Sequence, residues 1–375
     1  MPKIIYVANT DWYLFNFRIS LLKKMVEAGW QVIGAAPEGP YRKEIENIGV
    51  KFIPIILDRK GKNPFKELLS IWQLYKIYMN ERPTLVHHFT IKPVIYGSIA
   101  ARFVGDITVV NAITGLGYTL IRKGILRKFA ESFYKYSMRK SACAIFQNRA
   151  DLEYFLRRKL VDAEKAFLVE GSGVDVKKFS PVSSKSRSLE RISFLMASRM
   201  LWDKGVREFI VAAENVTKRF RKSYFWLAGA IDSGNPTSVP EEWLVGKTSS
   251  DHIKWLGHQE DIKVLMAEAD VIVLPSYREG LPKCLLEAAA MAKPIIATDI
   301  PGCREIVEDG INGILVPVGD SDKLEAAMIA MIEKDVSERE RMGMIGRKRV
   351  LERFADNIIL SKTFDIYRRI GFLIK

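Results

Sequence analysis

One stretch of this chain decides the expected fold: residues 276–287, which read SYREGLPKCLLE. The apolar run just before it, 271–274, predicts a buried strand, and the residues after Pro282 have the composition of a helix. Proline is favoured at the first helical position because its missing N–H would have no intrahelical partner there, so we expect Pro282 to open the helix. Pro294 marks the end of this helix. The segment is therefore predicted to run from strand through loop to helix.

The loop of this segment is predicted to bind an anion. The backbone N–H groups of Gly280, Leu281 and Lys283 would lie at the helix N-terminus, which favours negative charge. A carboxylate stands at each end, Glu279 in the loop and Glu287 about two helical turns in. This layout fits an elongated ligand, a diphosphate with hydroxyl-bearing groups on both sides, as in a sugar nucleotide. The alternative is that Glu279 caps a turn and Glu287 is an exposed helix residue.

Length and composition bound the class of protein. A chain of 375 residues exceeds the usual size of one core, so two domains are expected. The sequence contains no run of 18 apolar residues, so no transmembrane helix is expected. Met1–Asn9 lacks the features of a signal peptide. The three cysteines, Cys143, Cys284 and Cys303, show no CxxC spacing. This usage predicts a reducing, cytoplasmic location without structural zinc.

The net charge of +14 is unevenly distributed. Residues 1–185 hold 30 Lys and Arg against 16 Asp and Glu, whereas residues 186–375 hold 28 of each kind. Within the first half, Gly117–Arg149 carries one acid, Glu131, and eight basic residues among aliphatic and aromatic ones. This pattern favours a surface that lies on anionic lipid. The alternatives are a solvated basic helix and a nucleic-acid surface, although no nucleic-acid-binding signature accompanies the charge.

Strands and helices alternate along the chain, which is typical of parallel α/β sheets. In the first half, strands are predicted at 3–9, 31–36, 85–89, 107–113, 142–147 and 167–170. In the second half they are predicted at 192–197, 224–227, 253–256, 271–274, 295–298 and 314–316. The helices between them include 15–28, 65–80, 205–220 and 261–269, and the tail from 322 onward is helical.

Two Rossmann-like domains facing a cleft are thus expected. The polar stretch Ser180–Ser188 looks like a linker between an N-terminal acceptor- and membrane-facing domain, 1–182, and a C-terminal nucleotide-sugar-binding domain, 190–355. The last segment, 356–375, is expected to pack back on the N-terminal domain as a helix. In such sheets, ligands bind beyond the carboxyl ends of the strands.

These motifs resemble the family 4 retaining glycosyltransferases, which have the GT-B fold. Glu279 and Glu287 match the E-x7-E motif of that family, and Arg199 with Lys204 matches its R-x4-K-G diphosphate clamp. Further matches follow in order along the chain: Gly173-Val174-Asp175, Phe179-Ser180-Pro181, Gly229, Leu256-Gly257, Pro275-Ser276, Thr298-Asp299 and Asn312-Gly313. The resemblance covers essentially the whole chain.

The resemblance implies a role for each site residue. Arg199 and Lys204 would bind the donor diphosphate and stabilise its growing charge. Glu279 would hold hydroxyls of the transferred sugar, and Glu287 would hold the ribose. Backbone groups of the loop would complete the phosphate site, at Gly280, Leu281 and Pro282. Retention in this family is thought to proceed on one face of the sugar, with the leaving phosphate accepting the proton of the acceptor.

The N-terminal half matches the family less closely. Asn16 opens the first helix beside the family's loop for donor and acceptor, but the usual glycine pair is missing. The family often has H-x-H at the end of the strand 85–89, and here Phe89 falls in the register of the second histidine. His88 is therefore the candidate to face the reacting sugar, with His87 or neither as the alternatives. Motifs at 90–93 and 115–118 resemble a subgroup that extends polyprenyl-diphosphate-linked sugars.

Other chemistries find little support. Asp320-Ser321-Asp322 has the D-x-D spacing of metal-dependent transferases, but no further acids support it, and an N-cap is expected instead. No G-x-G-x-x-G occurs, which disfavours a nicotinamide enzyme. The four histidines show no metal spacing, so the site is expected to work without a metal or other cofactor.

The resemblance therefore implies a metal-independent, retaining transferase at the cytoplasmic face of a membrane. Its nearest counterparts are bacterial N-acetylgalactosaminyl and galactosyl transferases that act on polyprenyl-diphosphate-linked sugars. The expected donor is a UDP-sugar carrying N-acetylgalactosamine, N-acetylglucosamine or galactose, and the expected acceptor is a lipid-linked saccharide for a cell-surface glycan. The alternatives are a sugar-nucleotide epimerase of the same fold and a non-enzymatic basic protein that binds nucleic acid or lipid.

Overall fold

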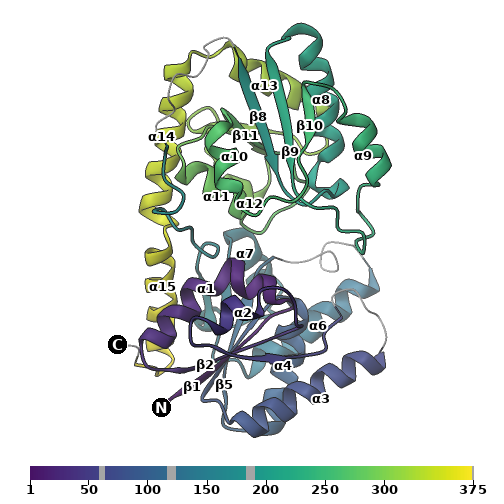
Figure 1. Cartoon of the computed structure of the whole chain (residues 1–375). Helices are drawn as coiled ribbons and strands as arrows, with labels where there is room; N and C mark the ends of the chain where they lie inside the picture. Colours follow the sequence, from purple (N-terminus) through teal and green to yellow (C-terminus); the bar gives the residue numbers. More distant parts are fainter. Residues whose placement is uncertain (59–63, 116–123, 183–190, 374–375) are drawn as a thin grey trace. The chain divides into compact units, whose positions relative to one another are not determined.

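The chain folds into two compact units. The computed structural model describes residues 1–58, 64–115, 124–182 and 191–373. The N-terminal unit comprises Met1–Ser172 together with Asn357–Lys375, and the C-terminal unit comprises Gly173–Asp356. Each unit is a parallel sheet with helices on both faces (Figure 1). This is the doubly wound arrangement that the alternating sequence pattern predicts.

The sheet of the N-terminal unit has seven parallel strands in the order β3-β2-β1-β4-β5-β6-β7. They are β1 (Lys3–Val7), β2 (Gln31–Ala36), β3 (Lys51–Pro54), β4 (Leu85–Phe89), β5 (Thr108–Ile113), β6 (Cys143–Phe146) and β7 (Ala166–Leu168). Strand β1 lies between β2 and β4, with Val7 opposite His88. The central strands are buried on both faces, so their sequences are apolar almost throughout.

Helices cover this sheet in two layers. They are α1 (Asp11–Glu27), α2 (Arg42–Glu46), α3 (Pro64–Glu81), α4 (Ile91–Val104), α6 (Ile125–Arg139), α7 (Arg149–Arg157) and α15 (Asp356–Arg369). Residues of α1 and α15 share one core cluster with β1 and β4, and residues of α3 and α4 share another. The phenol of Tyr367 on α15 lies 2.6 Å from His87 Nδ1, so the C-terminal helix is part of the N-terminal unit.

The C-terminal unit has six parallel strands in the order β10-β9-β8-β11-β12-β13. They are β8 (Ile192–Ala197), β9 (Ser223–Ala228), β10 (Ile253–Trp255), β11 (Val271–Leu274), β12 (Ile295–Thr298) and β13 (Gly313–Val316). Its helices are α8 (Val206–Arg219), α9 (Glu241–Lys247), α10 (Ile262–Glu268), α11 (Lys283–Ala290), α12 (Pro301–Arg304), α13 (Ser321–Glu333) and α14 (Val336–Arg353). The described residues also contain two 3₁₀ turns, η1 (Ala163–Lys165) and η2 (Trp202–Lys204).

One boundary differs from the sequence analysis. Residues 173–182, assigned there to the N-terminal domain, pack on the C-terminal unit. Val174 forms a bridge with Ala355, and its backbone N–H donates to the carbonyl of Phe354 at 3.0 Å. Val174 and Phe179 are buried in the core of that unit. The contacts therefore move the boundary to Ser172, before the polar stretch, whose residues 183–190 lie outside the described chain.

Candidate functional site

The loop between β11 and α11 forms the centre of the candidate site. Helix α11 begins at Lys283, one residue later than predicted, because Pro282 is its N-cap, with φ −74° and an extended ψ of 115°. The carbonyl of Pro282 accepts hydrogen bonds from the N–H groups of Leu285 (3.1 Å) and Leu286 (3.3 Å). Gly280 and Leu281 therefore precede the first turn of α11, at the positive end of the helix dipole.

A lysine from a different connection meets this loop. Lys204, at the end of η2, donates from Nζ to Glu279 Oε1 at 2.5 Å, and both side chains are mostly shielded from solvent. The next residue, Gly205, makes this approach possible. It adopts φ +79°, and a Cβ there would lie 2.2 Å from the carbonyl oxygen of Pro275. The β8–α8 connection can thus lie directly against the β11–α11 loop.

The electrostatics keep Lys204 charged. Burial on its own would lower the pKa of the Lys204 amine, but the opposite charge of Glu279 outweighs this effect and raises the pKa above its ordinary value. The site therefore holds a permanent ammonium group whose partner is the carboxylate that the family resemblance assigns to the sugar.

Arg199 lies at the carboxyl end of β8, on the same connection as Lys204. Its Nη1 donates to Asp232 Oδ2 at 2.7 Å, and its side chain is 45% exposed. The charge of Arg199 acts on Lys204, where it opposes the raised pKa. The two members of the predicted diphosphate clamp are thus close enough for their charges to interact. Each of them contacts a carboxylate that an incoming anion would have to displace.

Glu287 is buried, so the alternative interpretation of an exposed helix residue is wrong. Only 9% of the residue is accessible, because it lies on the inner side of α11. Burial raises the pKa of its carboxyl group to about 7, although the charges of Lys283 and Lys178 act in the opposite direction. The nearest cation, Lys283 Nζ, is 3.8 Å away. A buried carboxyl group with a pKa raised in this way, next to a helix N-terminus, is a candidate for a functional role.

Close backbone packing holds the loop in place. A Cβ on Gly302 at the start of α12 would lie 2.5 Å from the carbonyl oxygen of Gly280 and 2.8 Å from that of Glu279. On the other side, the hydroxyl of Thr298 donates to the carbonyl of Ser276 at 2.5 Å. The Ser276 hydroxyl is itself buried and has no hydrogen-bond partner among the described residues. The loop therefore packs closely against α12 and is hydrogen-bonded to β12.

The structure does not bring His88 into a reactive position. It is fully buried in the N-terminal unit, where its Nε2 lies 2.8 Å from the phenol of Tyr78 and its Nδ1 lies 2.8 Å from Asn111 Oδ1. The Cα of Gly97 packs against the imidazole, since a Cβ there would lie 2.3 Å from Nε2. Burial lowers the pKa of His88 to about 4. These contacts identify His88 as a neutral interior residue rather than a group that touches the sugar.

His87 faces the opposite side of the sheet from His88. It is buried beside Arg18, a cation on α1 that the sequence analysis did not single out. The guanidinium of Arg18 lies 4.4 Å from the ring centroid of Phe89 and donates to the phenol of Tyr13 at 2.9 Å. Asn16, the other candidate of this unit, is half-buried on α1, and its amide donates to the carbonyl of Trp12 at 3.1 Å.

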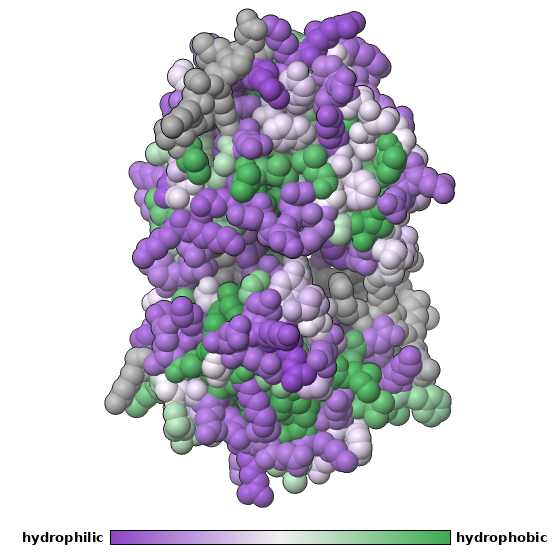
Figure 2. Space-filling view, viewed as in Figure 1, coloured by the Kyte–Doolittle hydropathy of each residue, from purple (hydrophilic) through white to green (hydrophobic). Residues whose placement is uncertain are grey.

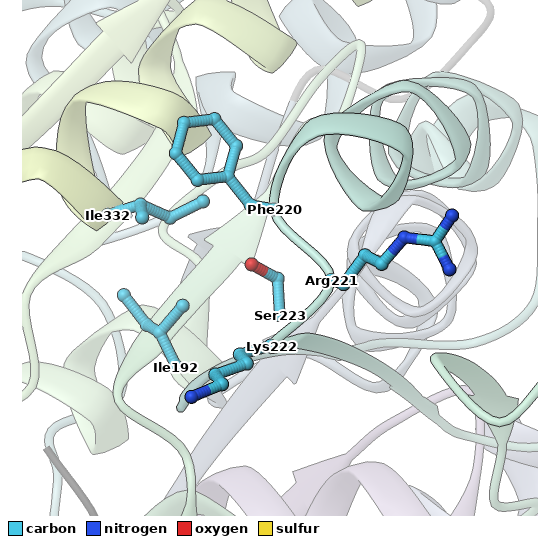
Figure 3. A pocket seen from close by; sticks show the side chains of 6 residues that line it. All are labelled: Ile192, Phe220, Arg221, Lys222, Ser223 and Ile332. Atoms are coloured by element: carbon cyan, nitrogen blue, oxygen red, sulfur yellow. The ribbon is translucent and has the colours of Figure 1, made fainter. Parts of the chain in front are cut away.

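Two other features lie apart from this chemistry. Asp320 caps α13 by accepting from the N–H of Lys323 at 2.8 Å, which confirms the structural interpretation of the D-x-D sequence. A hollow of 280 Å³ lies at the amino ends of β8 and β9, a whole strand away from the loop that follows β8 (Figure 3). Its lining residues are Ile192, Phe220, Arg221, Lys222, Ser223 and Ile332. Neither feature shares a residue with the candidate site.

The two Rossmann-like units, with a lysine–glutamate pair and a buried glutamate around a helix N-terminus, form the arrangement that is typical of GT-B glycosyltransferases. Family models agree: residues 191–334 match "Glycosyl transferases group 1", and residues 3–148 match "Glycosyl transferase 4-like". The chain belongs to this glycosyltransferase family and is a hexosyltransferase. The alternatives of an epimerase and of a non-enzymatic basic protein are not favoured by these matches.

Two relatives match most of the length of the chain. The N,N'-diacetylbacillosaminyl-diphospho-undecaprenol alpha-1,3-N-acetylgalactosaminyltransferase of Campylobacter jejuni is 27% identical over 98% of this chain and 99% of its own. The UDP-Gal:alpha-D-GlcNAc-diphosphoundecaprenol alpha-1,3-galactosyltransferase of Escherichia coli is 25% identical over 78% of this chain and 76% of its own.

Solved structures show the same fold. The sucrose-phosphate synthase of Thermosynechococcus elongatus superposes with a TM-score of 0.83 at 18% identity, covering 99% of both chains. Anabaena Alr3699/HepE in complex with UDP and glucose superposes with a TM-score of 0.79 at 17% identity, covering 98% of this chain and all of its own. Similarity at this level establishes the GT-B fold.

Proposed function

We propose that this hexosyltransferase moves a hexose or N-acetylhexosamine from a UDP-sugar to a polyprenyl-diphosphate-linked saccharide, with retention of configuration and without a metal. The observation that carries the donor assignment is the Lys204–Glu279 pair beside the N-terminus of α11. Lys204 of the β8–α8 connection and Glu279 of the β11–α11 loop bring a permanent cation and an acceptor of hydroxyl hydrogen bonds together beside a helix N-terminus, as a diphosphate joined to a sugar requires.

Each residue has a distinct task in the proposed reaction. Arg199 and Lys204 hold the diphosphate, and their charges stabilise the negative charge that grows as the sugar–phosphate bond breaks. Glu279, released from Lys204 by the incoming phosphate, accepts hydrogen bonds from the sugar hydroxyls. Glu287 binds the ribose hydroxyls. The leaving phosphate takes the proton of the acceptor hydroxyl on the same face of the sugar, which retains the configuration.

The acceptor assignment is supported by the relatives. The two described above are named as transferases that act on undecaprenyl-diphosphate-linked sugars, and the first of them matches 98% of this chain. An acceptor of that kind is anchored in a membrane. None of the helices among the described residues combines the length and apolarity that a membrane span requires. The protein is therefore proposed to reach its acceptor by docking on the cytoplasmic surface of the membrane.

Helix α6 supplies a basic surface for this docking. Its inner side is buried at Tyr134 and Met138, whereas Phe129, Phe133 and Tyr136 are 60%, 49% and 40% exposed. Basic residues alternate with these aromatics on the exposed side, at Lys128, Lys135 and Arg139. Such a face attracts anionic lipid headgroups, with about 1 kcal/mol for each basic residue near the surface. Residues 117–123 of the predicted basic segment lie outside the described chain.

Product analysis tests the proposal directly. The purified protein is incubated with UDP-N-acetylgalactosamine, UDP-N-acetylglucosamine or UDP-galactose and a polyprenyl-diphosphate-linked saccharide, with and without a chelator. One of these donors should extend the acceptor by one sugar in an α linkage, at the same rate with the chelator present. The Lys204→Ala variant serves as the control for a contaminating activity. Extension by none of the donors, or a β-linked product, would contradict the proposal.

A further inference from the structure

Helix α3 presents apolar residues on two opposite sides. Its inner side contributes Leu74, Ile77 and Tyr78 to the core of the N-terminal unit. Its outer side carries a second apolar row whose members are between 42% and 80% exposed, namely Phe65, Leu68, Leu69, Trp72 and Met79. The first four recur at spacings of three and four, and Met79 follows Trp72 by seven residues, or two helical turns, so the five form one stripe along the helix. A surface helix normally carries polar residues on this side.

Neighbouring helices extend the outer stripe into a surface. Helix α4 packs on α3, and α6 packs on α4. Phe103, near the end of α4, is 71% exposed, and the exposed aromatics of α6 follow beyond it. Figure 2 shows apolar residues gathered over α3, at the lower right of the molecule. We call this surface of α3, α4 and α6 the three-helix face.

The charges of the three-helix face are complementary to anionic headgroups. The three helices hold eight basic residues and three acidic ones. Each acid is already paired: Glu67 with Lys92 at 2.5 Å, Glu81 with Lys51 at 2.6 Å, and Glu131 with Arg158 at 2.8 Å. A second copy of the same face would oppose like charges, which disfavours self-association and leaves an anionic partner.

The aromatic residues of this face are matched to a lipid interface. The ammonium of Lys76 lies 3.8 Å from the ring centroid of Trp72, and the guanidinium of Arg102 lies 3.7 Å from that of Tyr136. Each pair joins an apolar ring to a cation on a long stem, which allows the ring to enter the acyl region while the cation remains among phosphates. Interfacial helices are built in this way.

We propose that α3 is the hydrophobic anchor of the protein, lying flat in the interface of an anionic bilayer with Leu68 and Trp72 among the acyl chains. The inference rests on the proposed membrane-linked acceptor and deepens it. The basic face of α6 attracts the protein to the surface, and the outer stripe of α3 inserts. Membrane binding therefore has two contributions. The electrostatic contribution of α6 is screened by salt, whereas the hydrophobic contribution of α3 persists at high salt.

Flotation with vesicles of phosphatidylglycerol in phosphatidylcholine, at low and high salt, tests the anchor. The double variant Leu68→Gln/Trp72→Gln should partition about 30-fold more weakly than wild type at high salt, because two apolar side chains no longer leave water. Met344→Gln/Leu351→Gln is the matched control, since these residues of α14 are 57% and 42% exposed. It should float like wild type. Equal flotation of the α3 variant and wild type would overturn the inference.

Tryptophan fluorescence tests insertion without altering the fold. The protein has seven tryptophans, and Trp72 is the one placed in the bilayer. Lipids brominated in the acyl chains should quench wild type, and most of that quenching should disappear in Trp72→Phe, which keeps an apolar ring and still floats. Undiminished quenching in Trp72→Phe would overturn the inference. A wild-type dimer that the double variant dissociates, without vesicle binding, would overturn it in favour of a self-association surface.

A water-soluble, short-chain acceptor separates this inference from the proposed function. With that acceptor the double variant should turn over like wild type, and with the same acceptor embedded in vesicles it should be slower. Flotation that depends on α3 in a protein that extends no polyprenyl-linked acceptor would uphold the anchor and reject the proposed acceptor. Extension of the embedded acceptor with full activity of the double variant would uphold the acceptor and reject the anchor.

Discussion

Glu287 allows a quantitative test, because burial raises the pKa of its carboxyl group from the ordinary 4.5 to about 7. Between these two pH values the native state binds more protons than the unfolded state. Stability therefore falls as the pH rises through this window, and the full cost of burying the carboxylate is present above pH 7. The difference between the two pKa values corresponds to about 3 kcal/mol.

The perturbation is Glu287→Gln, which keeps the shape of the side chain and removes its charge. Since the variant also loses the attraction of Lys283, we expect it to be more stable than wild type by about 1–3 kcal/mol at pH 8. For a unit of this size, the gain raises the melting temperature by about 3–9 °C. At pH 4, where wild type carries a neutral carboxyl group, the two proteins should melt at nearly the same temperature.

The same substitution should weaken ligand binding. The ribose hydroxyls of UDP bind the ionised carboxylate of Glu287 in the proposed site, so the affinity of wild type should rise with pH up to about pH 7 and then level off. At pH 8, Glu287→Gln should bind UDP about 10- to 100-fold more weakly, the scale of a hydrogen bond to a charged group.

Thermal unfolding and calorimetry at several pH values provide both measurements. The stability difference between Glu287→Gln and wild type could be the same at pH 4 and pH 8. That result would show that the ionised carboxylate of Glu287 does not destabilise the protein as its burial implies. UDP binding that is unchanged in the variant would show that Glu287 does not contact the ribose. If a buried carboxylate serves the ligand at the expense of stability, Glu287→Gln should be more stable than wild type and should bind UDP more weakly.

Three further substitutions separate the parts of the site. Lys204→Ala should reduce turnover about 100-fold or more while the protein remains folded, as circular dichroism would verify, and near-normal turnover would reject its role on the diphosphate. Glu279→Ala should impair the use of the sugar nucleotide more than the binding of free UDP; calorimetry that finds the larger loss for UDP would reverse the roles of the two glutamates. Gly302→Ala should weaken UDP binding because its Cβ would meet the carbonyls of Glu279 and Gly280 at 2.8 and 2.5 Å, and unchanged affinity would show that the loop can shift freely.

The local elements of the C-terminal unit were readable from the sequence. Strands β11 (Val271–Leu274) and β12 (Ile295–Thr298) have the predicted bounds, because short apolar runs between turn residues leave little choice of structure. The cap at Asp320 could also be predicted, because its hydrogen bond is local and joins residues that are three positions apart in the sequence. The short elements β3 (Lys51–Pro54), α2 and α9 were missed, because Pro54 interrupts the apolar run at β3, and helices of five and seven residues are too short to show a helical period.

Burial was harder to infer for single polar residues. The sequence offered His88 as a group at a strand end, and only the packing of Tyr78, Gly97 and Asn111 around it shows that it is an interior residue. Alternation along a strand assigns each residue to a face of the sheet. It does not reveal which helix covers that face, or whether that helix supplies a hydrogen-bond partner for each ring nitrogen of a histidine.

By itself, the sequence determined the fold class, the family and the residues of the donor motif, because these depend on local periodicity and on spacings within one connection. Only the tertiary structure decided how Lys204 meets Glu279, why Glu287 has a raised pKa and which side of α3 is exposed. Each of these depends on segments far apart in the chain, and the environment of a charge or an apolar side chain is set by everything packed around it, which no local pattern records.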